Sequence, residues 1–191
     1  MPINDDEFED DPEPTAEDIE REIATLLRDV EIGALAVVQA DGSPLVADLH
    51  FAGDGLSVYV HTYTYTRKYK ALLRDPRVSY ALALMPAGGY FERFQLRAIQ
   101  VQGIATVVDD PAEIERAITK CGEQFSWLGD SAIFDNFRRE GIELRQVFIR
   151  IDPVSAMWND NRVHLLWRKM VEFSEDHRRI TAVRDYDTTA R

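Results

Sequence analysis

The chain has 191 residues, 45% of them apolar, and a formal net charge of −12. This length is typical of one domain with a sizeable core, and the composition excludes a wholly disordered protein. The single cysteine, Cys121, excludes an intrachain disulfide and a cysteine-based metal cluster, and it favours a reducing, cytoplasmic setting.

Negative charge is concentrated at the N-terminus. Residues 1–22 contain eleven acidic residues and one basic residue, a net charge of about −10, so residues 23–191 carry only about −2. A nearly neutral body argues against nucleic acid as a partner, because proteins that bind it usually present a net basic surface. The sequence shows neither a signal-sequence pattern nor an apolar run long enough for a membrane span, so we expect no membrane partner.

The acidic N-terminal segment is poor in apolar residues and contains several prolines, and we expect a disordered tail over 1–15. Thr15 and Asp18 have the spacing of a capping box, and apolar residues at helical spacing predict an amphipathic helix over 16–29. We expect one folded domain over 16–175 and a C-terminal tail over 176–191.

The rest of the chain is rich in strand patterns. Two Asp-Gly turn signals and an Asp-Pro pair punctuate runs of apolar and β-branched residues. We expect strands at 32–40, 44–52, 56–62, 77–85, 94–110, 143–158 and 162–170. We expect helical segments at 67–74, 111–125 and 131–140. Gly103 predicts a bulge or bend in the long strand. About seven mostly antiparallel strands favour a closed barrel with peripheral helices, an α+β protein that is mostly β.

The short helix after the third strand begins with cations. Thr66 is a candidate N-cap, and Arg67 and Lys68 follow in the first turn. Cations there oppose the positive end of the helix dipole unless an anion lies among them, and an Arg with a Lys suits a phosphate monoester. The alternative is a solvated surface helix, which fits Lys70 and Arg74 better because of their i,i+4 spacing.

The order of these features resembles the pyridoxamine 5′-phosphate oxidase-like family of FMN-binding split β-barrels. The resemblance covers residues 17–110 well and 143–170 loosely. Its most specific part is Thr66-Arg67-Lys68, placed seven residues, counted from Lys68, before Asp75-Pro76-Arg77-Val78-Ser79. It implies an antiparallel split barrel that binds FMN, with Arg67 and Lys68 on the flavin phosphate, and a homodimer with the flavin at the subunit interface.

The resemblance also implies residues beside the flavin. Thr62 and Thr66 would assist the phosphate site, and the strand segments that contain His50 and His61 would line the flavin, largely through backbone groups. Without the resemblance, a histidine on a strand is more often a packed or hydrogen-bonded residue than a catalyst. The spacing of the four histidines does not indicate a metal site.

A second, weaker resemblance lies near the C-terminus. The sequence from Trp158 to His164 is similar to the end of the oxidase itself, which implies that Trp158 lies by the flavin. Arg162 and His164 would then touch a small-molecule substrate. The alternative is an ordinary hairpin turn at 159–161, since Asn and Asp tolerate positive φ.

The chain departs from the oxidase in ways that argue against vitamin B6 oxidation. It lacks the Ser/Arg-rich segment that grips the substrate phosphate, and Leu166 and Ala98 stand where the oxidase has arginine and glutamine. We therefore expect an FMN-dependent oxidoreductase with an unidentified small-molecule substrate. The alternatives are a deazaflavin-dependent reductase and a non-catalytic flavin- or haem-binding protein. No catalytic residue is predicted, because the flavin carries hydride chemistry itself.

Overall fold

The computed structural model describes residues 12–89, 91–129, 131–139 and 145–187. The helices are α1 (Ala16–Asp29), α2 (Arg67–Arg74) and α3 (Pro111–Gln124), with 3₁₀ segments η2 (Glu92–Phe94), η3 (Ser126–Leu128) and η4 (Ala132–Arg138). The strands are β1 (Ile32–Val38), β2 (Pro44–Asp54), β3 (Ser57–Tyr63), β4 (Arg77–Leu84), β5 (Arg97–Val107), β6 (Gln146–Asp160), β7 (Arg168–Phe173) and β8 (Ile180–Asp185).

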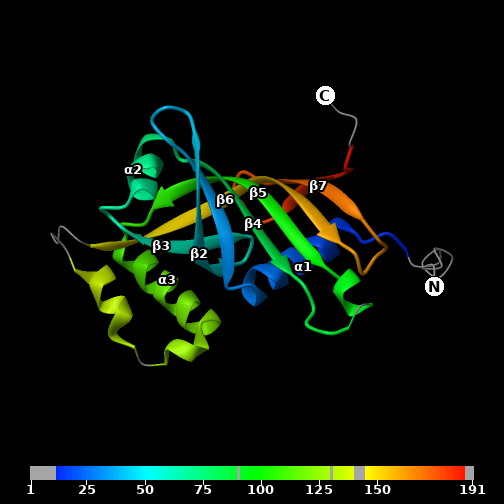
Figure 1. Cartoon of the computed structure of the whole chain (residues 1–191), viewed down its shortest axis with the longest axis horizontal. Coiled ribbons are helices and arrows are strands. Elements are labelled where there is room, and N and C mark those ends of the chain that lie inside the picture. Colours follow the sequence, from blue (N-terminus) through cyan, green and yellow to red (C-terminus); the bar gives the residue numbers. More distant parts are fainter. Residues whose placement is uncertain (1–11, 90, 130, 140–144, 188–191) are drawn as a thin grey trace.

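These strands form one antiparallel sheet in the order β3-β2-β1-β4-β5-β6-β7-β8, and an additional β3–β6 pairing closes six of them into a barrel (Figure 1). β6 has 15 residues; its N-terminal part pairs with β3 and its C-terminal part with β7. The strands β7 and β8 therefore extend beyond the closed barrel. The predicted antiparallel split barrel with peripheral helices is confirmed.

Helix α1 packs its apolar face into the barrel interior. Its buried residues Ile19, Ile23, Leu26 and Leu27 join the same core cluster as the inward side chains of the strands. The capping box predicted at Thr15 is present, since its side chain accepts the N–H of Asp18 and Asp18 accepts the N–H of Thr15. The capping box therefore determines where α1 begins, and the apolar face of α1 is buried against the barrel core.

A second, smaller core lies outside the barrel. There α3 and η4 cover the outer face of β2, β3 and β6, where Ala52, Tyr59 and Phe148 pack against residues such as Cys121 and Phe137. The outer face of β1, β4 and β5 is different, because no residue on it is large and buried. We call it the open sheet face; it consists of Ala34, Ala36, Ser79, Ala81, Gln100 and Gln102.

Two expectations for the C-terminal region are corrected. The strand expected over 162–170 begins at Arg168, because residues 161–167 form turns in which Leu166 has a φ of 64° and its N–H donates to the Asn161 side chain. The expected tail at 176–191 contains β8, which pairs with β7 and is held to α1 by a hydrogen bond from the N–H of Ile180 to Glu20. Most of the tail predicted over 1–15 lies outside the described residues.

The bulge predicted at Gly103 is confirmed by a register shift between β5 and β6 at this residue. A Cβ at Gly103 would lie 2.6 Å from the carbonyl oxygen of Asp152, a backbone atom that cannot move aside cheaply. We expect Gly103→Ala to lower the free energy of unfolding by about 1–3 kcal/mol, measured by chemical denaturation.

The matched control is Gly122→Ala, because no atom lies within 4 Å of a Cβ built at Gly122 and this residue lies inside α3. This variant should be more stable than the parent, by about 0.5–1 kcal/mol. Equal effects of the two substitutions would show that the close approach at the bulge is not a constraint.

Candidate functional site

The N-terminus of α2 is built from two threonines. Thr66 is the N-cap, and its Oγ1 accepts the N–H of Tyr69 at 3.4 Å and donates to the carbonyl of Tyr63 at 2.9 Å. The same oxygen lies 3.0 Å from Oγ1 of Thr62, so Thr62 is the donor in that contact. The buried Thr62 on β3 thereby fixes where α2 begins relative to the barrel.

The first turn of α2 holds Arg67 and Lys68 and no acidic residue. Arg67 is exposed, whereas Lys68 is half-buried and burial lowers the pKa of its ammonium group. Both cations lie at the positive end of a helix, where a bound anion would stabilise them. Arg74, at the other end of α2, has a structural role instead, because it donates to the carbonyl of Val38 at 2.7 Å.

His61 lies within electrostatic reach of both Lys68 and His50. The ring of His61 contacts Phe137 and Phe148, at centroid distances of 5.7 and 6.3 Å. Burial lowers the pKa of His61 to about 4, with smaller contributions from His50 and Lys68, so its imidazole is neutral at pH 7. The structure therefore brings together His50, His61 and Lys68, three of the residues predicted from the sequence.

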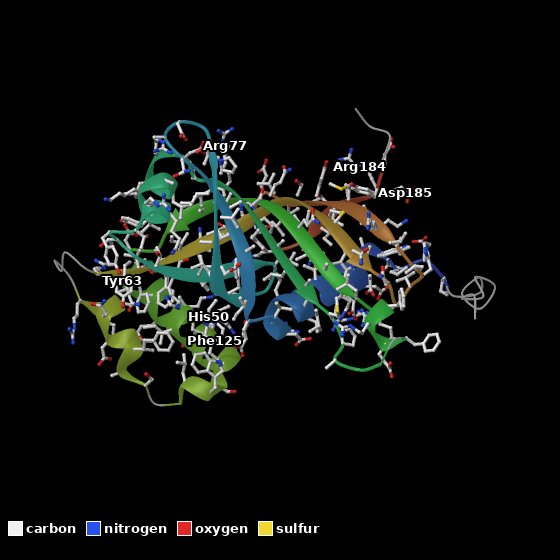
Figure 2. The ribbon with its side chains drawn as sticks, viewed as in Figure 1. His50, Tyr63, Arg77, Phe125, Arg184 and Asp185 are labelled. Atoms are coloured by element: carbon white, nitrogen blue, oxygen red, sulfur yellow. The ribbon has the colours of Figure 1, made fainter. Side chains whose placement is uncertain are left out.

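His50 has one polar atom that the protein does not satisfy. Its ring packs against Phe125 at 5.3 Å and Trp127 at 5.9 Å, and Figure 2 shows His50 and Phe125 side by side. Its Nδ1 is buried and has no hydrogen-bond partner among the described residues. An unsatisfied buried nitrogen is costly, and a ligand that reached it would remove that cost.

The predicted C-terminal residues form a separate group. Trp158 is fully buried, and together with Trp167, Arg162 and His164 it lines a cavity of about 530 Å³, which we call the tryptophan cavity. No residue from 61 to 68 lines this cavity. Within one chain, the structure thus collects Trp158, Arg162 and His164 in one place and the phosphate-site residues in another.

Arg162 is already paired with carboxylates. Its guanidinium donates to both Oδ atoms of Asp160, at 2.8 and 2.6 Å, and to Glu22 at 2.5 Å. The hydrogen bonds to Asp160 are the main cause of a raised pKa for Arg162. His164 is exposed, and its Nδ1 lies 3.2 Å from the carbonyl oxygen of Leu165.

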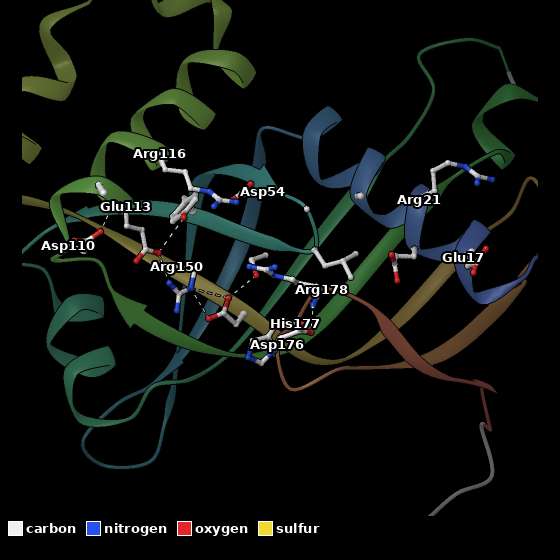
Figure 3. Close-up of a pocket in the computed structure, with 18 residues that line it drawn as sticks. Glu17, Arg21, Asp54, Asp110, Glu113, Arg116, Arg150, Asp176, His177 and Arg178 are labelled. Atoms are coloured by element: carbon white, nitrogen blue, oxygen red, sulfur yellow. Dashed lines mark hydrogen bonds and ion pairs between the residues drawn. The ribbon is translucent and has the colours of Figure 1, made fainter.

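The sequence did not indicate a larger polar cavity of about 850 Å³ bordered by α1, α3 and the turn before β8 (Figure 3). At its wall Arg150 donates to Asp152 at 2.8 Å and to Glu113 at 2.5 Å. Tyr59 donates to Glu113, and burial is the main cause that raises its pKa to about 12. These groups come from β3, α3 and β6, and the only local signal is the Arg-x-Asp alternation at 150–152, which places both side chains on one strand face.

Among the described residues, no group of three or more His, Cys, Asp or Glu side chains is placed to hold a metal ion. Within the same ranges, no helix has the length and apolar character needed to cross a membrane.

The sequence profile of a family described as Pyridoxamine 5′-phosphate oxidase matches residues 20–157. A search of curated proteins found no match. Among solved structures, a conserved hypothetical protein from Mycobacterium tuberculosis matches with a TM-score of 0.61 and 24% identity, over 75% of this chain and 86% of that one. An FAD-binding protein from Mesorhizobium loti matches with a TM-score of 0.52 and 21% identity, over 71% and 90%.

A third similar structure is HutZ, the haem storage protein from Vibrio cholerae, with a TM-score of 0.53 and 21% identity, over 71% of this chain and 89% of that one. At these identities the likeness to the three structures concerns the fold. One fold therefore occurs both in a protein described as binding FAD and in one described as storing haem.

The buried imidazole predicts a pH dependence of stability. The folded chain keeps His61 unprotonated down to about pH 4, whereas the unfolded chain protonates it near 6.5. The free energy of unfolding should therefore fall as the pH drops from 6.5 to 4, by about 3 kcal/mol from this group. Chemical denaturation across this range should show a flatter dependence for His61→Phe.

The control for this series is His164→Phe, because His164 is exposed. It should retain the steep dependence of the parent. If His61→Phe and the parent lose stability in parallel between pH 6.5 and 4, His61 is not the group responsible.

Proposed function

We propose that this chain, which belongs to the pyridoxamine 5′-phosphate oxidase family, is an FMN-binding oxidoreductase that transfers hydride or electrons to or from a small molecule. The observation that carries the proposal is the cation pair Arg67 and Lys68 behind the Thr66 cap, in a first turn without acidic residues. A phosphate at this position would accept from the free N–H groups of α2 and neutralise both side chains.

The residues around α2 fit FMN. Arg67 offers a two-pronged donor and Lys68 a partly desolvated point charge, while Thr62 and Thr66 hold the helix start in place. His61 and His50 would lie beside the flavin ring, His61 as a neutral imidazole and His50 with an Nδ1 that needs a partner. Bound FMN supplies the redox chemistry, and the chain positions it and sets the local charge.

We further propose a cytoplasmic homodimer with the flavin between two copies. The open sheet face supports this, because its small side chains would let a second copy approach closely: Ala34 lies opposite Ala81 and Ala36 opposite Ser79. A shallow cavity of about 400 Å³ lies on this face. Trp158, Arg162 and His164 remain the proposed flavin- and substrate-side residues, and the tryptophan cavity is their common location.

A second candidate function, haem binding, is favoured by one observation. An imidazole nitrogen without a hydrogen-bond partner among the described residues, such as Nδ1 of His50, is a suitable ligand for haem iron. On this alternative the cations of α2 would hold no phosphate. A deazaflavin-dependent reductase would instead use the same cations as the FMN proposal.

The phosphate site is tested by the double variant Arg67→Ala/Lys68→Ala. Each charge-assisted contact contributes about 1.5–3 kcal/mol, so the Kd for FMN should rise by roughly 100-fold or more. Titration followed by flavin fluorescence measures this directly.

Lys70→Ala is the matched control, because Lys70 is an exposed cation on the same helix. It should change the Kd for FMN less than about threefold, as expected for a surface charge. A double variant that keeps FMN as tightly as the parent would exclude the proposed phosphate site.

A further inference from the structure

The carboxylate of Glu13, near the N-terminus, contacts Trp167 and Lys169 beside the tryptophan cavity. Oε2 of Glu13 accepts the indole N–H of Trp167 at 3.1 Å and forms an ion pair with Nζ of Lys169 at 3.2 Å. Trp167 is only 2% exposed, whereas the side chain of Glu13 is 63% exposed. An exposed side chain on an N-terminal segment thus satisfies a buried indole.

Lys169, the ion-pair partner of Glu13, has other contacts as well. Lys169 also pairs with Asp185 on β8 at 2.7 Å, and its ammonium lies 5.4 Å from the centre of the Trp167 ring. Its side chain is 15% exposed. Lys169 therefore has contacts other than Glu13, with Asp185 of β8 and the Trp167 ring.

The segment that carries Glu13 forms part of the cavity wall. Residues 12–14 line the tryptophan cavity together with Trp158, Arg162 and His164. We call residues 12–15 the arm. Its C-terminal end is fixed by the capping box, in which Asp18 accepts from both the N–H and the hydroxyl of Thr15.

The sequence of the arm is suited to docking and release as a unit. Pro12 and Pro14 flank Glu13 and restrict the backbone, so the arm loses little entropy when Glu13 docks. A partly exposed ion pair and one hydrogen bond hold such a segment only marginally. Docked and released positions of the arm are therefore close in free energy.

We propose that the arm is a latch on the tryptophan cavity, closed when Glu13 contacts Trp167 and Lys169 and open when it is released. The closure rests on the contacts of Glu13 alone. The consequence that the latch controls entry of the substrate rests on the proposed function, in which Arg162 and His164 meet the substrate in this cavity.

The test is quenching of tryptophan fluorescence by acrylamide, in the full chain with Trp127→Phe as the parent. This change removes the exposed Trp127, which leaves only Trp158 and Trp167 as reporters. Glu13→Ala should raise the quenching constant roughly twofold or more, because acrylamide then reaches the buried indoles. The matched control Glu17→Ala, an acidic residue of α1 that lines the polar cavity instead, should leave the constant unchanged.

A circular dichroism melt shows whether each variant is folded. If Glu13→Ala does not fold, Pro14→Gly takes its place, because it loosens the arm without changing a charge. An unchanged quenching constant in the folded variant, or an equal rise in Glu17→Ala, would overturn the latch. The readout requires neither flavin nor turnover, so its failure is distinct from failure of the FMN proposal.

Discussion

The pairing of β3 with β6 is the contact on which the barrel and the candidate site depend. Six residue pairs, from Val58 opposite Ile151 to Tyr63 opposite Gln146, join strands that are about 90 residues apart in the chain. Because side chains alternate along a strand, Thr62 lies on one face of the sheet and His61 on the other.

The face of His61 also carries Tyr59, Phe148 and Arg150. The β3–β6 register therefore places the aromatic side chains around the histidine and the wall of the polar cavity on one face of the sheet.

The same strand, β3, also positions the start of α2 through Thr62. Thr62 contacts Thr66, and Thr66 caps the first turn beside β3, where burial removes part of the hydration of Lys68 and lowers its pKa. A fold that keeps Arg67 and Lys68 against the helix dipole gives up stability locally, and an anionic ligand would recover it. The unsatisfied Nδ1 of His50 is a second such cost on the same side of the barrel. Two costs that one ligand could offset are the physical basis of the cofactor proposal.

Local signals in the sequence determined how much could be predicted. The helix expected over 16–29 is α1, and the one expected over 67–74 is α2. In each helix the residue just before the first turn is a threonine N-cap and the residue just after the last turn has extended backbone, so local sequence determines both ends. The strand expected over 162–170 begins only at Arg168, since the side chain of Asn161 stabilises a turn by accepting the N–H of Leu166, five residues away. The local sequence of β8 does not indicate a strand, because its pattern is short and its contacts come from β7 and α1. The ion pair of Arg150 with Glu113 joins residues 37 positions apart, which no local pattern encodes, whereas the contact of Thr62 with Thr66 lies within four residues.

Binding of FMN by this chain can be measured by the visible absorption spectrum of the freshly purified protein during gel filtration, before and after addition of FMN. We expect flavin bands at ~370 and ~450 nm, positions that reflect the flavin ring itself, and we expect them to elute with the protein at the size of a dimer. A colourless protein that does not retain added FMN would contradict the FMN proposal. A band near ~400 nm in place of the flavin bands would contradict it in favour of haem.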